Sequence, residues 1–211
     1  MKKITITLLV ILSCFCASAQ YYYKESGFLL GVNAEYKHPL GDFGKMNKYS
    51  LGVNIAGKYL INRAIGLGFE IGYHPFKTDA KNSSSVSQDL KTNLIPILFE
   101  TTFYIPTWDR TLLPYLGLHF GGYLTNIKVK QAGLYGESNV SKKINRFAIG
   151  IGPHVGLLVE LSEFIKLDIK LRGDYVPKIK KSYDIDDYTT GSLAFDKIIN
   201  IGLSAGLLYT F

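Results

Sequence analysis

The chain has 211 residues with a formal net charge of +7, and 47% of its residues are hydrophobic. This length allows one large domain or two small ones, and a mean hydropathy of +0.10 excludes both a disordered chain and a bundle of membrane-spanning helices. The 21 glycines and 15 tyrosines favour many strands joined by tight turns over helices.

The first twenty residues, MKKITITLLVILSCFCASAQ, are organised like a secretory signal peptide. Two lysines precede an apolar core over residues 4–12, and an Ala-Ser-Ala motif ends at Ala19. The apolar run is too short to span a membrane as a helix. We therefore predict a signal peptide over residues 1–19, cleavage between Ala19 and Gln20, and a mature domain over residues 20–211.

Both cysteines, Cys14 and Cys16, lie inside this segment. The mature chain then has no disulfide, no thiolate nucleophile and no cysteine-ligated metal. Lipidation at Cys14 is an alternative to cleavage after Ala19, because the residues before it faintly resemble a lipobox. No later segment approaches 18 consecutive apolar residues, so the exported chain is either soluble or a membrane β-barrel.

From Gly27 onwards, bulky apolar residues alternate with small or polar ones, which is the period of a β-strand. The alternation occurs in eight segments: GFLLGVNAEYK, SLGVNIAGKYL, AIGLGFEIGYH, NLIPILFETTFYI, YLGLHFGGYLTN, RFAIGIGPHVGLLVEL, IKLDIKLRGDYV and IINIGLSAGLLYTF. Strands of about ten residues cross a bilayer when tilted. Pro96 and Pro153 fall inside strands, so we expect a bulge or a missing ladder bond near each.

The connections alternate in length. Short links at Asn62-Arg63, around Trp108 and at Ser162-Glu163 alternate with long polar segments, which are residues 38–49, 77–92, 128–145 and 178–197. This pattern predicts an all-β fold, an eight-stranded antiparallel up-and-down transmembrane β-barrel with short periplasmic turns and long extracellular loops. The last strand would close the barrel against the first.

The narrow bore of such a barrel suits the glycine-rich face, so the bulky face should meet lipid. A soluble, lipocalin-like barrel that buries the bulky face is the alternative. We expect two girdles of aromatic residues. The periplasmic one comprises Tyr59, Phe103, Tyr104, Trp108, Tyr115, Tyr209 and Phe211, and the outer one Tyr36, Tyr73, Phe147 and Tyr175.

The polar face would bring ionisable residues together in the lumen. They are Glu35, Lys58, Glu70, Glu100, His119, His154, Glu160, Lys166, Asp168, Lys170, Arg172 and Asp174. Charges in so confined a space must be paired. Two interpretations stay open, a structural network that plugs the bore and a gated narrow pore, and the size of the bore favours the plug.

The sequence offers no catalytic, metal-binding or cofactor-binding arrangement that we can name. None of His38, His74, His119 and His154 has a serine two residues later, as the histidine–serine pair of a barrel deacylase would require. The glycines of GLGFEIG lie inside a strand, so they do not form a phosphate-binding loop. We expect no enzyme, no cofactor and no nucleic-acid partner.

Five basic residues gather in the third long segment, namely Lys128, Lys130, Lys142, Lys143 and Arg146. They form either a patch that meets the phosphates of lipopolysaccharide or the surface of a solvated loop.

The motifs GVNAEYKHPLGDFG, IGLGFEIGYHPF, LPYLGLHFGGYL and LSAGLLYTF resemble outer-membrane β-barrel domain proteins of the porin-like, OmpX/OmpA-barrel class, of the type common in Bacteroidetes. The resemblance implies a monomer in the outer membrane of a Gram-negative bacterium, in contact with its lipid. It also implies insertion by the outer-membrane barrel assembly machinery through a terminal signal, here Leu207, Tyr209 and Phe211. We expect a structural or surface-interaction role through the long loops. A small diffusion pore and a lipid A-modifying hydrolase are the alternatives.

Overall fold

The structure is a computed structural model that describes residues 27–62, 64–78, 88–107, 111–131, 140–177, 182–186, 189–192 and 197–211. The predicted signal peptide, its cleavage site between Ala19 and Gln20, Cys14 and Trp108 lie outside these residues. Within the described ranges, no helix is long and apolar enough to cross a membrane.

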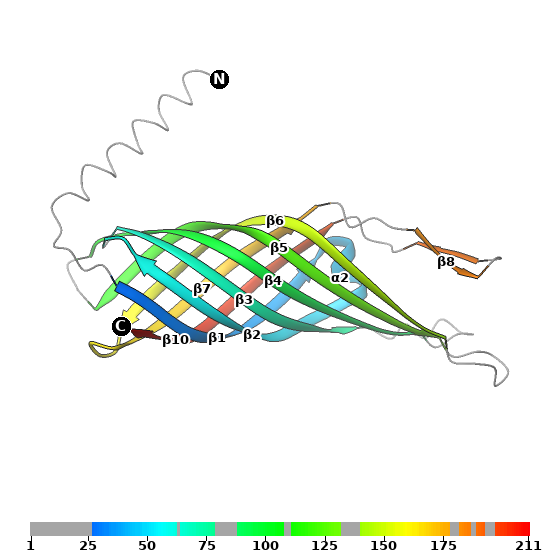
Figure 1. The fold of residues 1–211 in the computed structure, drawn as a ribbon, viewed down its shortest axis with the longest axis horizontal. Coiled ribbons are helices and arrows are strands. Elements are labelled where there is room, and N and C mark those ends of the chain that lie inside the picture. Colours follow the sequence, from blue (N-terminus) through cyan, green and yellow to red (C-terminus); the bar gives the residue numbers. More distant parts are fainter. Residues whose placement is uncertain are drawn as a thin grey trace, which may run out of the picture.

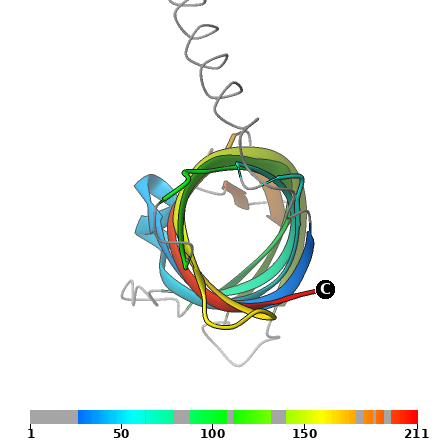
Figure 2. The same ribbon diagram turned by 90° about the vertical axis from the view of Figure 1, so that its left-hand side faces the viewer.

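Eight strands close into an antiparallel barrel (Figures 1 and 2). They are β1 (Gly27–Leu40), β2 (Asn47–Leu60), β3 (Ile65–Thr78), β4 (Gln88–Tyr104), β5 (Leu112–Gln131), β6 (Val140–Glu160), β7 (Ile165–Val176) and β10 (Ile198–Thr210). Their order around the barrel is β1-β10-β7-β6-β5-β4-β3-β2, which confirms the predicted up-and-down topology. The strands β8 (Ser182–Asp186) and β9 (Thr189–Ser192) form a separate hairpin, where the sequence predicted only a loop.

The first and last strands close the barrel as predicted. β10 pairs with β1 from Leu29 opposite Thr210 to Leu40 opposite Ile199. The backbone N–H of Phe211 donates to the carbonyl of Phe28 at 3.0 Å. The C-terminal residue is therefore held by the first strand.

Side chains stabilise the short turns. Asn62 Oδ1 accepts hydrogen bonds from the backbone N–H groups of Ala64 and Ile65 at 2.8 and 2.7 Å, and Ser162 Oγ accepts one from Ile165 at 3.1 Å. Asn and Ser favour turns because their side chains bond the backbone nearby. We call this end of the barrel, which also holds the C-terminus, the short-turn end, and the opposite end the long-loop end (Figure 1).

The two prolines inside strands each interrupt one ladder. The β3–β4 pairing is broken beside Pro96, and the β6–β7 pairing is broken beside Pro153. Pairing resumes in the same register beyond each gap. The predicted missing ladder bonds are therefore confirmed, and neither proline produces a bulge in that ladder.

The strands reach further toward the long-loop end than the sequence predicted. β1 includes residues 38–40, and the helix α2 (Gly41–Met46) follows at once through Gly41, whose φ is +62°. β5 and β6 have 20 and 21 residues, whereas β7 has 12. Polar composition suggested loops here, but polar residues also pair in a ladder once the strands extend beyond the membrane.

The bulky face points outward. Leu51, Phe147 and Ile149 are 65%, 63% and 67% exposed, and the exposed residues continue around the wall. A soluble monomer rarely exposes so much contiguous apolar surface. The lipocalin-like alternative is therefore wrong, and the outer surface has the composition of a membrane-facing wall.

Candidate functional site in the barrel lumen

The lumen holds the ionisable residues that alternation placed on the inner face of the wall. Of the twelve predicted residues, eleven are buried. The twelfth, Glu160, is partly exposed at the short-turn end, where Lys166 Nζ lies 3.2 Å from its carboxylate. These buried side chains lie inside the barrel, whose ring of strands Figure 2 shows from the short-turn end.

Two cations of β7 reach across the whole bore. β7 and β3 occupy opposite positions in the ring of eight strands. Lys170 Nζ nevertheless donates to Glu70 Oε2 at 2.7 Å, and Arg172 Nη1 bonds the other oxygen of Glu70. These bonds join opposite walls of the barrel across the lumen.

Each of these cations also has a second carboxylate partner. Lys170 donates to Glu100 at 2.7 Å, and Arg172 donates to Glu35 at 2.6 Å. The amide of Asn54 donates to the same oxygen of Glu35 at 2.7 Å. Buried charges are tolerated when they are paired and hydrogen-bonded in this way.

Asp174 forms a second centre nearer the long-loop end. Lys37 Nζ donates to one of its oxygens at 2.6 Å. The hydroxyl of Tyr123 donates to the other oxygen at 3.0 Å, and His119 Nε2 lies 3.0 Å from that oxygen. Asp174 therefore ties β1, β5 and β7 together.

Asp168 forms a third centre nearer the short-turn end. Lys58 Nζ donates to it at 2.7 Å, and the hydroxyl of Tyr115 donates to its other oxygen at 2.5 Å. Lys58 also lies 4.9 Å from the centre of the Tyr115 ring. The network thus continues along the bore as well as across it.

Apolar clusters close the network at both ends. The cluster at the long-loop end comprises Phe43, Phe76, Leu94, Leu98, Tyr123, Ile127, Val176 and Ile198. The cluster at the short-turn end comprises Leu29, Ala56, Tyr104, Tyr115, Leu158 and Leu208. Phe43 comes from α2 and packs edge-on against Phe76 at 5.2 Å. The ion pairs therefore lie in a compartment that apolar side chains separate from both mouths.

Glycines on the inner face leave room for this network. A Cβ on Gly117 would lie 2.5 Å from His154 Nε2, and a Cβ on Gly202 would collide with the carboxylate of Glu35. The glycine-rich face is thus required by the larger side chains that lie over it.

The histidines do not assemble a reactive centre. His119 and His154 stack with ring centres 5.9 Å apart, His154 Nε2 lies 3.2 Å from the hydroxyl of Thr102, and His74 Nε2 lies 2.8 Å from Asn54 Oδ1. All three are buried. Among the residues that the structure describes, no group of His, Cys, Asp or Glu could hold a metal ion.

The predicted set of twelve left out Lys37, Asn54, His74, Tyr115 and Tyr123, which also belong to the network. Each lies an even number of residues from a predicted luminal residue on the same strand, so the alternation could have placed it in the lumen. Tyr104 and Tyr115 were assigned to the periplasmic girdle, but they are 4% and 2% exposed and face the lumen. Aromatic rings suit both a membrane girdle and a packed lumen. Only the position in the alternation along the strand shows which face the ring is on.

The five predicted basic residues do not form one loop patch. Lys128 and Lys130 belong to β5, and Lys142, Lys143 and Arg146 belong to β6. Arg146 lies opposite Thr125, whose side chain is buried, whereas the side chain of Lys128 is exposed on the outer surface. Lys128 and Arg146 therefore lie on opposite faces of the wall.

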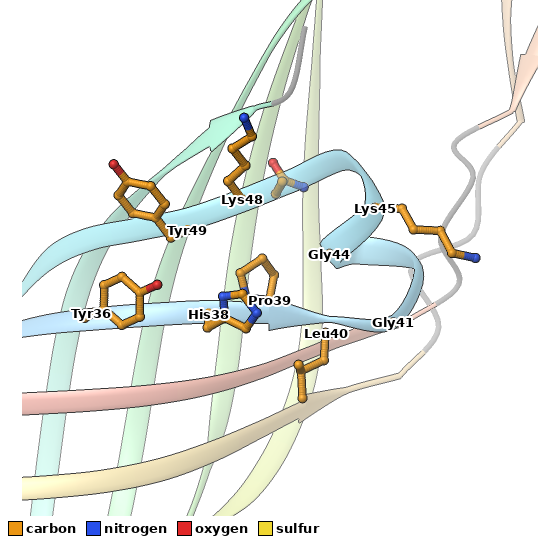
Figure 3. A pocket seen from close by; sticks show the side chains of 10 residues that line it. Tyr36, His38, Pro39, Leu40, Gly41, Gly44, Lys45, Lys48 and Tyr49 are labelled. Atoms are coloured by element: carbon orange, nitrogen blue, oxygen red, sulfur yellow. The ribbon is translucent and has the colours of Figure 1, made fainter. Parts of the chain in front are cut away.

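An open cavity of about 430 Å³ lies where β1, α2 and β2 meet at the long-loop end (Figure 3). Tyr36 and Tyr49 stack at one side, 5.8 Å apart, and His38 and Lys48 line the middle. Lys45 points away from the barrel and pairs with Asp42 at 2.7 Å. Its hydrogen bond and charge lower the pKa of the Asp42 carboxyl. The lining contains no serine or cysteine beside His38, so the cavity holds no nucleophile–base pair.

Comparison with known proteins agrees with this geometry. A family model described as "Outer membrane protein beta-barrel domain" matches residues 7–211. The solved structure of Neisserial surface protein A is similar, with a TM-score of 0.56 at 21% identity over 87% of this chain and 97% of that chain. OprG from Pseudomonas aeruginosa gives 0.53 at 12% identity over 90% and 97%. AlkL in lipid bilayers gives 0.51 at 16% identity over 90% and 92%. No match was found among curated proteins.

Proposed function

Because the chain belongs to the outer membrane protein β-barrel domain family, we propose that it serves as a structural or surface-interaction barrel rather than as a diffusion pore. It is an integral β-barrel of the Gram-negative outer membrane. Its long-loop end then faces the cell exterior and its short-turn end faces the periplasm.

The observation that carries this proposal is the bond between opposite walls. Lys170 and Arg172 both reach Glu70 across the bore, and apolar clusters lie above and below. To cross the barrel, a solute would have to displace both the buried ion pairs and the apolar side chains above and below them. This packing supports a barrel that does not conduct solutes. The protein then acts through its surfaces.

Conductance tests the closed lumen. The mature chain, purified from outer membranes and inserted into planar bilayers, should give no resolved single-channel openings. Discrete openings in the unmodified protein would support the alternative of a small gated pore. Folding is checked beforehand by the slower or faster gel migration of the unheated barrel relative to the boiled one.

We also propose that the protein has no enzymatic activity. His38 is the histidine on the outer surface, and among the described residues it has no hydrogen-bonding serine or acid partner. Mass analysis of lipid A from cells that produce the protein should show an unchanged profile. Removal or addition of an acyl chain would contradict this proposal.

Assembly and oligomeric state follow from the closure of the barrel. Leu207 and Tyr209 on the outer face of β10, and Phe211 directly after it, are exposed, where assembly machinery could bind an aromatic terminal strand. Within the described strands, the closed ring leaves no pairing edge at the level of the membrane, which supports a monomer. The resemblance to barrels of the type common in Bacteroidetes stays a prediction from the sequence.

A further inference from the structure

The last hairpin of the chain has two ladders that share one register. β7 and β10 pair as far as Val176 opposite Ile198, and β8 and β9 pair from Ser182 opposite Ser192. Five residues separate the two ladders on each limb, namely 177–181 and 193–197. β8–β9, which we call the distal hairpin, is therefore in register with the β7–β10 ladder, although it stands apart as a separate sheet beyond the long-loop end (Figure 1).

β6 has a free edge on the side that faces this hairpin. It pairs with β5 from Val159 opposite Leu112 out to Val140 opposite Gln131. On its other side the outermost register pair is Ile151 opposite Tyr175, and no described strand pairs there with residues 140–149. These residues include no proline, so the backbone N–H and C=O groups that point to this side form an unblocked edge.

A proline accounts for the place where β7 leaves this edge. Pro177 directly follows Val176, and it has no backbone N–H to donate to a ladder. The pairing of β7 with β6 and with β10 ends before it. The sequence from there to the end of β8 at Asp186 contains no further proline, so nothing of this kind prevents β8 itself from pairing.

The register of the β6–β7 ladder leads the distal hairpin onto the free edge. This register has Ile151 opposite Tyr175. Nine residues further out on each strand, it places Lys142 of β6 opposite Asp184 of β8. The two limbs advance equally, so β8 would lie beside β6 without a shift in register and without extra chain.

Pairing would stabilise both parts. A two-stranded hairpin alone is marginally stable in water, and a long free edge can pair with other chains. With β8 on β6, the distal hairpin joins the sheet of β4, β5 and β6, and the outermost strand becomes β9, which has only 4 residues. Short edge strands are one of the means by which proteins avoid edge-to-edge association.

Charge favours the distal hairpin over a second copy of β6. Residues 140–149 include Lys142, Lys143 and Arg146 and no acidic residue, whereas the β8 sequence SYDID includes two aspartates and no basic residue. Opposite charges stabilise a cross-strand pair and like charges destabilise it. Two β6 edges would bring cations together, whereas β8 supplies the opposite sign.

We infer that the distal hairpin adds to the free edge of β6 in the register of the β6–β7 ladder. The strands β4, β5, β6, β8 and β9 then form one continuous ribbon beyond the membrane. The occupant of the edge is a segment of the same chain, so its pairing is intramolecular and favoured by the short tether. This inference goes beyond the proposed function and does not depend on it, because neither a filled nor a conducting lumen alters the edge.

Cysteine cross-linking tests the register. Cys14 and Cys16 lie in the predicted signal peptide, so the mature chain is a background without thiols. K142C/D184C and K143C/Y183C are successive pairs of the expected ladder, and one of them has the closer, non-hydrogen-bonded geometry that suits a disulfide. In lipid vesicles, with copper phenanthroline as oxidant, at least one pair should form an intramolecular disulfide about tenfold faster than the matched control K142C/Y183C, whose side chains would point to opposite faces.

Hydrogen exchange tests the same pairing without cysteines. In the unmodified mature chain, the peptide covering residues 140–149 should exchange about tenfold more slowly than in a variant in which Gly-Ser-Gly replaces residues 178–196. A peptide from the membrane-spanning part of β5 is the control and should exchange equally in both proteins.

Two results would overturn the inference. One is that neither in-register pair cross-links faster than the control, or that disulfide-linked dimers form instead, which would assign the edge to a second copy. The other is equal exchange of residues 140–149 in a shortened variant that folds by gel migration. If the cysteine variants do not fold, the exchange comparison decides alone.

Discussion

Replacing Arg172 by methionine tests the network where it crosses the lumen. Arg172 is buried and bonds both Glu70 and Glu35. In the variant, Glu70 keeps Lys170 at 2.7 Å. Glu35 keeps only the Asn54 amide, His74 at 3.4 Å and Lys37 at 3.8 Å. One buried carboxylate is thus left without a close cation.

The structure sets the size of the effect. Removing one partner of a buried ion pair costs about 3–5 kcal/mol, and methionine refills part of the volume, so we expect a loss near the lower value. Urea unfolding of the barrel in lipid vesicles, followed by gel migration of the folded form, gives the free energy of unfolding. With a slope of about 2 kcal/mol per molar urea, the midpoint should fall by about 1.5 M.

A second substitution separates an orphaned charge from lost packing. In R172M/E35Q the unpaired carboxylate is neutral, so this variant should be more stable than R172M by about 2 kcal/mol. If the midpoint of R172M lay within about 0.3 M of the unmodified protein, the cross-lumen network would not be a stabilising unit. A double variant no more stable than R172M would show that the loss comes from packing alone.

Three further predictions concern other parts of the barrel. Replacing Phe211 by alanine should lower the amount of folded barrel in outer membranes, measured by gel migration, whereas replacing it by tyrosine should preserve that amount. Equal amounts of the two variants would exclude a role for the aromatic ring. F43A should lower the free energy of urea unfolding by about 3 kcal/mol, since a buried phenylalanine is lost; an unchanged midpoint would show that α2 does not close the lumen. G202V should prevent folding because its Cβ would meet Glu35, whereas G57A, whose nearest atom is 3.4 Å away, should fold normally; normal folding of both would contradict the packed lumen.

Alternation alone predicted which face of each strand turns inward. Glu35, Asp168 and Asp174 could be placed in the lumen because the period of a strand is two residues and an eight-stranded bore admits the smaller face. The partners of these residues could not be predicted. Lys170 and Glu70 are 100 residues apart, and their contact depends on strand tilt and register across the whole ring.

Composition was a poor guide at the strand ends. Tyr104 and Tyr115 have the size and polarity of girdle residues, yet their parity turns them inward, where they pack edge-on at 5.5 Å. Lys128 and Lys143 were assigned to a loop because they are charged, yet they are register partners in β5 and β6. Charge indicates contact with water, and a strand that continues beyond the membrane satisfies that condition as well as a loop does.

The unequal strand lengths divide the long-loop end into two parts with different roles. About ten residues suffice to cross a bilayer, so the 20 and 21 residues of β5 and β6 leave a paired ribbon above the membrane, to which β4 adds a third strand as far as Gln88 opposite Gln131. On the other side, β1 ends at Leu40 and α2 turns Phe43 inward onto the luminal cluster. The β1–α2–β2 side therefore covers the luminal cluster, whereas the β4–β6 side holds a hydrogen-bonded surface above the bilayer. Because hydrogen bonding holds this surface in shape without a ligand, binding there would not require a loop to become ordered first, and so the β4–β6 ribbon is where the surface role should be sought.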